Sequence, residues 1–139
     1  MSGSRRQSRE AALQVLYLKD ISRNLLLEIP GPVWSEEPLE PKAKAFAKRL
    51  AEGALAHQAE LDALIEKVAE NWEMHRMATI DRCLLRLAAY ELVHECDTPI
   101  NVIINEAVEI AKKYSTGESG KFVNSILDKI KLERKNGKS

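Results

Sequence analysis

Three arginines near the start of the chain have the spacing that places side chains on one side of a helix. Arg5, Arg6 and Arg9 are related by i, i+3 and i, i+4 steps, and Tyr17 continues the row through Arg5, Arg9 and Leu13. Guanidinium groups form forked hydrogen bonds with phosphates, and a tyrosine ring offers a face on which bases can stack. The spacing predicts a nucleic-acid surface. The alternative is that the arginines only keep the start of the chain soluble.

A second polar group lies at the start of the last expected helix. Phe122 is one step off an apolar stripe, Lys121 precedes it, and Asn124 follows one turn after Lys121. A cation, an exposed ring and an amide at a helix N-terminus suit single-stranded nucleic acid. The alternative is that Phe122 widens the core face of its helix. The stripe itself consists of Val123, Ile126, Leu127 and Ile130.

Residues with catalytic side chains are present, but none stands in a catalytic pattern. Cys83 and Cys96 are not flanked by a nucleophile signature, and Cys83 lies in an apolar run that favours a buried thiol. The glycine-containing stretch at 116–120 lacks the Lys-Ser/Thr pair of a phosphate-binding loop. We therefore expect no enzymatic activity. The possible bases are His57, His75 and His94.

Metal binding is weakly indicated. Glu91 and His94 form a single Glu-x-x-His step, whereas a di-iron bundle needs two such steps and two further glutamates. The tripeptide His94-Glu95-Cys96 has no second Cys/His pair at zinc spacing. We interpret these residues as a polar helix end and expect neither a metal nor another cofactor.

The composition is that of an ordinary globular domain. The 139 residues suit one domain, spanning 1–139, with 45% hydrophobic and 30% charged residues. The 21 basic and 21 acidic residues cancel, which argues against a uniformly basic nucleic-acid coat and leaves local patches near the chain ends. No apolar run has the length of a membrane span, and two cysteines make no disulfide framework. We expect a cytoplasmic protein.

Helical periodicity dominates the chain, and no strand-like alternation is found. A first helix is expected from residue 8 to about residue 27, followed by a proline-rich loop over 28–41. Residues 43–72 form either one bent helix or two, with a break near His57. The segment 80–95 is apolar on nearly every side, which is typical of a buried central helix. The fold class is therefore all-α, a bundle around this helix.

Two boundaries near the end of the chain can also be predicted. Thr98-Pro99 resembles an N-cap followed by proline at the first helical position, and Ser115-Thr116-Gly117 ends the same helix. The tail over 134–139 is expected to be frayed.

Four stretches together resemble one protein family. They are RRQSREAALQVLY at 5–17, IDRCLLRLAAYEL at 80–92, NEAVEIAK at 105–112 and KFVNSILD at 121–128. In order and spacing they resemble the bacterial transcription antitermination factors called NusB. Gln7 and Ser8 make the arginine-rich start less dense than is usual in that family.

The resemblance implies a fold and a function. The fold is a helical bundle of two packed subdomains. The function is non-enzymatic: binding of boxA RNA together with NusE, a small-subunit ribosomal protein, in the transcription elongation complex with other Nus factors, which promotes rRNA operon transcription. Tyr17 and Asp81 are implied on the partner side. The implied RNA-binding residues are Arg5, Arg6, Arg9, Glu118, Lys121, Phe122 and Asn124.

Two other functions compete with this hypothesis. The helical RNA-targeting domain of an rRNA cytosine methyltransferase resembles the same fold, but that enzyme needs a Rossmann-like domain, and no glycine-rich strand–turn–helix segment occurs here. The other alternative is a purely protein-binding bundle whose arginines only solubilise it. Salt-dependent RNA binding distinguishes that bundle from an RNA-binding factor.

Overall fold

The computed structural model describes residues 2–21, 40–70, 73–95 and 97–134. Within these ranges all regular structure is helical, which confirms the all-α prediction. Two short 3₁₀ turns, at Met74–Arg76 and Lys131–Glu133, accompany the main helices. The main helices are α1 (Ser2–Ile21), α3 (Pro41–Ala56), α4 (Gln58–Val68), α5 (Thr79–His94), α6 (Ile100–Tyr114) and α7 (Gly117–Ile130).

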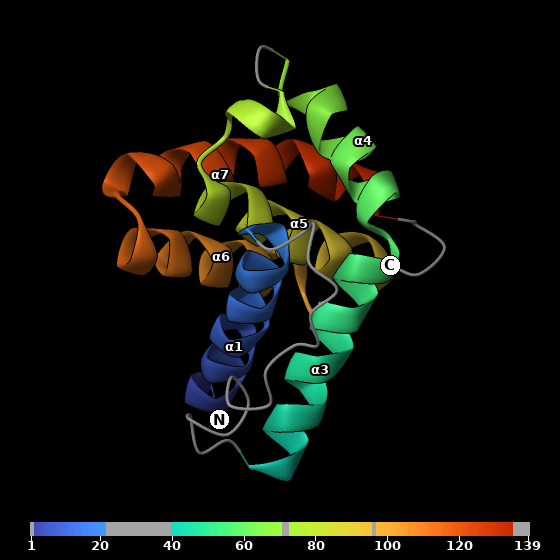
Figure 1. Cartoon of the computed structure of the whole chain (residues 1–139), viewed down its shortest axis with the longest axis vertical. Helices are drawn as coiled ribbons and strands as arrows, with labels where there is room; N and C mark the ends of the chain where they lie inside the picture. Colours follow the sequence, from blue (N-terminus) through green and yellow to red (C-terminus); the bar gives the residue numbers. More distant parts are fainter. Residues whose placement is uncertain (1, 22–39, 71–72, 96, 135–139) are drawn as a thin grey trace.

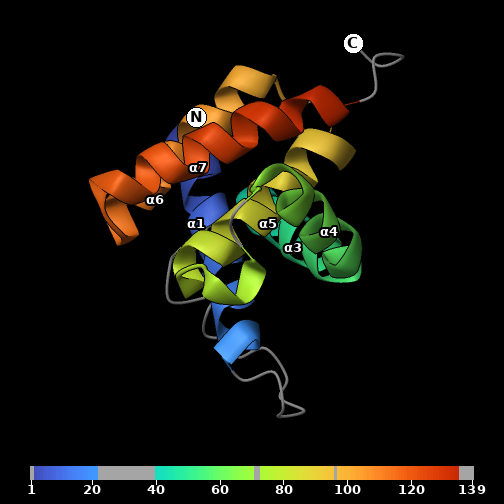
Figure 2. The same ribbon diagram turned by 90° about the horizontal axis from the view of Figure 1, so that it is seen from above.

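The helices form two groups that meet at α5. Helix α1 lies beside α3, and α6 lies beside α7 in a second layer that crosses the first (Figures 1 and 2). Helix α5 contacts both groups and also α4. The predicted arrangement of two packed subdomains around a central helix is therefore confirmed.

Helix α5 is central because it has apolar residues on every side, and these pack against the helices around it. Every residue from Cys83 to Leu92 is buried, and Leu85 and Leu92 have no exposed surface. Full burial of one leucine side chain contributes about 1.5–3 kcal/mol. The helix also buries Arg86 and Glu91. Because buried charges must be paired, these two residues require partners from other helices.

The break predicted near His57 is confirmed, and it separates α3 from α4. The His57 backbone N–H donates to the Gly53 carbonyl at 3.0 Å, and α4 then begins at Gln58. Just before the break, α3 approaches α5 closely. A Cβ atom on Gly53 would lie 2.2 Å from the Tyr90 ring, so only glycine allows this approach.

The starts of α3 and α6 differ from the sequence prediction by two residues and by one residue, respectively. Pro41, expected in the proline-rich loop, is the first residue of α3, where its missing N–H costs nothing. The rest of that loop, residues 28–39, lies outside the described residues. Pro99 is the cap residue of α6 and Ile100 its first residue, so the prediction of Thr98 as N-cap is wrong.

The prediction of a frayed tail from residue 134 is wrong for Arg134 itself. Its guanidinium donates to the carbonyl of Leu92 at 2.7 Å and to that of Thr98 at 2.9 Å. It also donates to the carbonyls of Glu91 and Glu95, both at 3.3 Å. The last carbonyls of a helix lack partners within the helix, and Arg134 supplies them for α5. Residues 135–139 lie outside the described residues.

Candidate nucleic-acid interface

Arg9 does not lie on the surface. Only 4% of the residue is exposed, and its Nε and Nη2 donate to the two carboxylate oxygens of Glu91 at 2.7 and 2.8 Å. Glu91 is 1% exposed. Arg9 therefore shares no exposed face with Arg5 and Arg6, and its role in RNA binding stays a prediction. Arg9 instead neutralises a carboxylate on the central helix, because a buried charge without a partner is costly.

Arg6 remains partly exposed and joins α1 to α6. Its guanidinium makes a two-pronged ion pair with Glu106, with 34% of the Arg6 side chain exposed. The hydrogen bonds to Glu106 raise the pKa of Arg6 above its ordinary value. One turn along α1, Glu10 accepts hydrogen bonds from Lys113 and Tyr114 at 3.0 and 3.1 Å. The start of α1 is thus fixed along α6.

Arg5 is exposed and lies against an aromatic ring. Its guanidinium carbon is 4.1 Å from the centre of the Phe46 ring on α3. Arg9 and Arg49 approach the same ring at 5.4 and 5.2 Å. Cation–π contacts of this kind contribute about 0.5–1 kcal/mol where the cation is exposed. The ring orients Arg5 while its charge stays in contact with solvent.

A groove of about 690 Å³ runs between α6 and the start of α7. Three of the predicted RNA-binding residues, Glu118, Lys121 and Asn124, line it together. The Thr116 side chain caps α7 by accepting a hydrogen bond from the Ser119 N–H at 3.0 Å. The groove therefore adjoins a helix N-terminus, where the helix dipole and free N–H groups favour anions. The remaining lining residues are Asn105, Val108, Lys112, Thr116, Gly117 and Gly120.

The cations of this groove are accessible. Lys121 is 3.8 Å from Glu118, and both side chains are more than four-fifths exposed. Exposed pairs of this geometry contribute little to stability, so either side chain can be drawn to a ligand at small cost. Asn105 is adjacent in sequence to Glu106, the partner of Arg6.

Phe122 is partly buried and does not line the groove. Its ring packs against the apolar core, while the residue keeps intermediate exposure. The ring therefore widens the core face of its helix, and the role of Phe122 in nucleic-acid binding stays a prediction. The predicted core positions beside it, Val123, Ile126, Leu127 and Ile130, are all buried.

Asp81 is buried in the first turn of α5, and its place in a partner-binding surface stays a prediction. It accepts a hydrogen bond from the Ser119 hydroxyl at 3.1 Å, which links the first turns of α5 and α7. Among the described residues no group donates to its other oxygen, Oδ1. Burial raises the pKa of Asp81 above its ordinary value, although the Ser119 hydrogen bond acts in the opposite direction. Tyr17, the other predicted partner residue, is 36% exposed.

A partly buried network of ion pairs at the far end of α1 was not predicted from the sequence. Asp20 pairs with Arg82 and Arg86, and Arg86 also pairs with Asp62 through Nε at 2.7 Å. Burial would raise the pKa of Asp20, but the hydrogen bonds from the two arginines outweigh it and hold that pKa below its ordinary value. The arginines recur at i, i+4 on the central helix, a signal that could have indicated a shared partner.

The thiol of Cys83 is not suited to nucleophilic catalysis. The residue is fully buried, and burial raises its pKa to about 12. A thiol with such a pKa is protonated near neutral pH, whereas the thiolate is the nucleophile. Cys96, the other candidate, lies outside the described residues. None of the described helices is long and apolar enough to cross a bilayer.

The fold and the groove define an all-α bundle with a solvent-open surface groove that contains two lysines. Residues 6–131 match the model of the NusB family. The transcription antitermination protein NusB of Elusimicrobium minutum is 43% identical over 139 residues, and the match covers 99% of each chain. That of Desulfitobacterium hafniense is 48% identical over 129 residues, covering 91% of this chain and 87% of the relative. The chain belongs to the NusB family.

Solved structures agree with this assignment. T. maritima NusB superposes with a TM-score of 0.85 at 40% identity, covering 96% of this chain and 95% of the other. A chain in the crystal structure of antitermination factors NusB and NusE in complex with dsRNA gives a TM-score of 0.85 at 30% identity. That match covers 95% of this chain and 98% of the other.

Proposed function

We propose that this protein is a transcription antitermination factor that binds boxA RNA together with NusE and promotes transcription of rRNA operons. One observation carries the proposal. The fold matches, over 95% of the chain, a chain of the complex that NusB and NusE form with dsRNA. The cationic groove between α6 and α7 gives such a fold a surface for phosphates.

The RNA-binding surface consists of the start of α1 and the groove. Arg5 and Arg6 contribute charge from α1, and Lys121 and Asn124 contribute a cation and an amide from α7. Phe122 presents its accessible edge to a base, and Glu118 holds Lys121 when RNA is absent. Because few cations take part, the chain alone binds RNA with modest affinity and a shallow salt dependence.

NusE binds on the exposed side of α1 beyond the arginines. Tyr17 and Ile21 are one turn apart and are 36% and 56% exposed, so they form an apolar strip that a partner can cover. The bound partner extends the RNA-contacting surface, and the complex joins the transcription elongation complex with other Nus factors. The chain acts in the cytoplasm by tethering RNA and performs no catalysis.

RNA binding is tested by fluorescence anisotropy of labelled boxA RNA at several salt concentrations, with and without NusE. We expect tighter binding to boxA than to a scrambled RNA, and a further gain when NusE is added. Lys121→Ala should reduce the slope of log affinity against log salt by about one. Lys67→Ala is the matched control, since Lys67 is an exposed lysine on α4 that does not line the groove.

Two results would contradict the proposal. Equal affinity for boxA and scrambled RNA, with or without NusE, would exclude sequence-specific recognition. Equal effects of Lys121→Ala and Lys67→Ala would remove the groove from the RNA-binding surface.

The proposed NusE surface is tested separately: Tyr17→Ala should weaken NusE binding in calorimetry. Leu132→Ala, which truncates another exposed apolar side chain, should leave NusE binding unchanged.

A further inference from the structure

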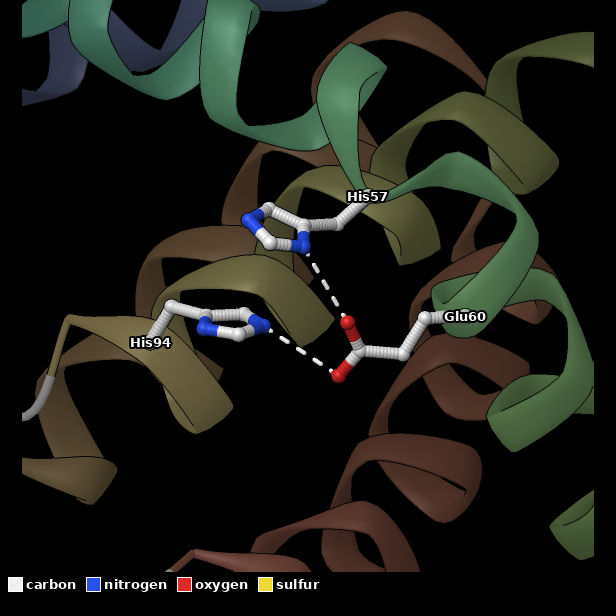
Figure 3. A group of neighbouring side chains, drawn as sticks. All are labelled: His57, Glu60 and His94. Atoms are coloured by element: carbon white, nitrogen blue, oxygen red, sulfur yellow. Dashed lines mark hydrogen bonds and ion pairs between the residues drawn. The ribbon is translucent and has the colours of Figure 1, made fainter.

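Two histidines and a glutamate meet on the side of the molecule where α4 and the end of α5 lie close together. His57 stands at the junction of α3 and α4, Glu60 in the first turn of α4, and His94 is the last residue of α5 (Figure 3). The sequence alone gives His94 only Glu91, Glu95 and Cys96 as neighbours. The fold brings the other two residues to it from more than thirty positions away.

The three side chains converge on one point. His57 Nδ1 lies 3.1 Å from Glu60 Oε1, and His94 Nε2 lies 3.2 Å from Glu60 Oε2. One ligand atom from each residue lies within 4.8 Å of the others. In a tetrahedral zinc shell, with metal–ligand bonds of about 2.0–2.2 Å, neighbouring ligand atoms are about 3.3–3.5 Å apart. The ligand atoms are at most 4.8 Å apart, so small side-chain rotations would bring them to that spacing.

Aromatic stacking fixes the orientation of both imidazoles. The His57 and His94 rings are 4.2 Å apart at an angle of 23°, and Tyr90 stacks on His94 at 5.3 Å. Figure 3 shows that one nitrogen of each ring faces the Glu60 carboxylate. A neutral imidazole can carry its proton on the other nitrogen, so both facing nitrogens can act as ligands without loss of a proton.

We propose that His57, Glu60 and His94 form a binding site for a divalent transition metal, with Zn²⁺ as the best match. Two imidazole nitrogens and one carboxylate oxygen are zinc ligands, whereas Mg²⁺ and Ca²⁺ take oxygen ligands. The cluster is open to solvent, so water completes the shell. The ion links the α3–α4 junction to the end of α5 and stabilises the packing of those two segments.

The site is tested by calorimetric titration of ZnCl₂ into untagged, chelator-treated protein. We expect one ion per chain. Because loss of a supporting residue alone costs metal sites about 10–100-fold in affinity, His57→Gln, Glu60→Gln and His94→Gln should each weaken binding at least ~10-fold. His75→Gln is the matched control. His75 also lies beside a glutamate, with its Nε2 3.3 Å from Glu73, but no second imidazole is part of that pair.

Cysteine ligation is distinguished by Cys96→Ser and by the visible spectrum of the Co²⁺-loaded protein. We expect unchanged affinity for Cys96→Ser and no thiolate charge-transfer band. Circular dichroism of each variant establishes that it is folded. The proposal is overturned if wild type binds no Zn²⁺, if His75→Gln weakens binding as much as His94→Gln, or if Cys96→Ser abolishes binding while Glu60→Gln does not.

Discussion

The start of α1 and the groove between α6 and α7 contain similar side chains and use them differently. At the start of α1, Arg9 is buried against Glu91, and Arg6 pairs with Glu106. In the groove, Lys121 and Glu118 are both highly exposed and 3.8 Å apart. In the first set, the fold requires Arg9 because Glu91 would otherwise be buried without a partner, whereas the Arg6 pair stays partly exposed. The second set is available to a ligand, because water screens its pairing.

The difference comes from neighbouring helices rather than from residue type. Helix α1 packs on both α3 and α5, so an arginine on its inner side enters the core. Helix α7 packs mainly on α6, and Glu118 and Lys121 near its start face solvent. Clustered cations therefore indicate a nucleic-acid surface only where no helix covers them.

The largest expected effect is on stability. Arg9→Ala leaves the Glu91 carboxylate buried without its partner, which costs about 3–5 kcal/mol in the free energy of unfolding. Urea unfolding measures this loss. Arg5→Ala is the control, and it should cost no more than about 1 kcal/mol because that arginine is exposed over Phe46. Equal losses in the two variants would break the distinction between buried and exposed arginines.

Phe122→Ala should have the next largest effect. It should reduce both RNA affinity and the free energy of unfolding. If the accessible edge of the ring stacks on a base, RNA binding weakens by about 1–3 kcal/mol. Stability should fall by less than the ~3–5 kcal/mol expected for emptying a fully buried aromatic site, because the ring is only partly buried. Both quantities are measured on the same variant. Normal RNA affinity with a large loss of stability would restrict Phe122 to a packing role.

Arg6→Ala should have a smaller effect that separates the two regions further. Its ion pair with Glu106 is partly exposed, so stability should fall by about 1 kcal/mol or less. The salt slope of RNA binding should fall by about one, as expected for one lost phosphate contact. Glu106→Gln frees the same guanidinium and should not reduce that slope. A stability loss as large as that of Arg9→Ala would place Arg6 with the structural charges.

The smallest expected effect is a pH dependence at Asp81. Its pKa is raised in the folded protein, so the folded state binds the proton more tightly than the unfolded state. Stability should therefore decrease as pH rises from about 4, the ordinary aspartate value, through the raised folded pKa. Asp81→Asn lacks this ionisation, so it should be more stable than wild type at about pH 7.

The advantage of Asp81→Asn should disappear toward about pH 4. Asp20 acts in a separate window, because its pKa is lowered and its contribution is lost only as pH falls below the ordinary value. Urea unfolding of both proteins across this range measures the difference. A constant difference at every pH would show that ionisation of Asp81 is not its cause.

Local patterns were sufficient to predict much of the fold. Apolar spacing predicted the central helix over 80–95 and the core stripe of α7, and both were confirmed. The change of periodicity near His57 predicted the boundary between α3 and α4. Lys121 and Asn124 were predicted at the start of the last helix, but α7 begins at Gly117, one turn before Lys121, because Thr116 caps it there. These features follow from contacts between residues a few positions apart.

The sequence by itself determined the helices and their apolar faces, because helical periodicity is a local property that every turn repeats. Only the tertiary structure decided which polar residues are buried. Arg9 meets Glu91 across 82 positions, and Arg134 meets the end of α5 across about 40. Nothing in the spacing around either arginine encodes its partner. The physical reason is that a charge is stabilised by whichever opposite charge or dipole packing brings within a few ångströms, and that packing is a property of the whole chain.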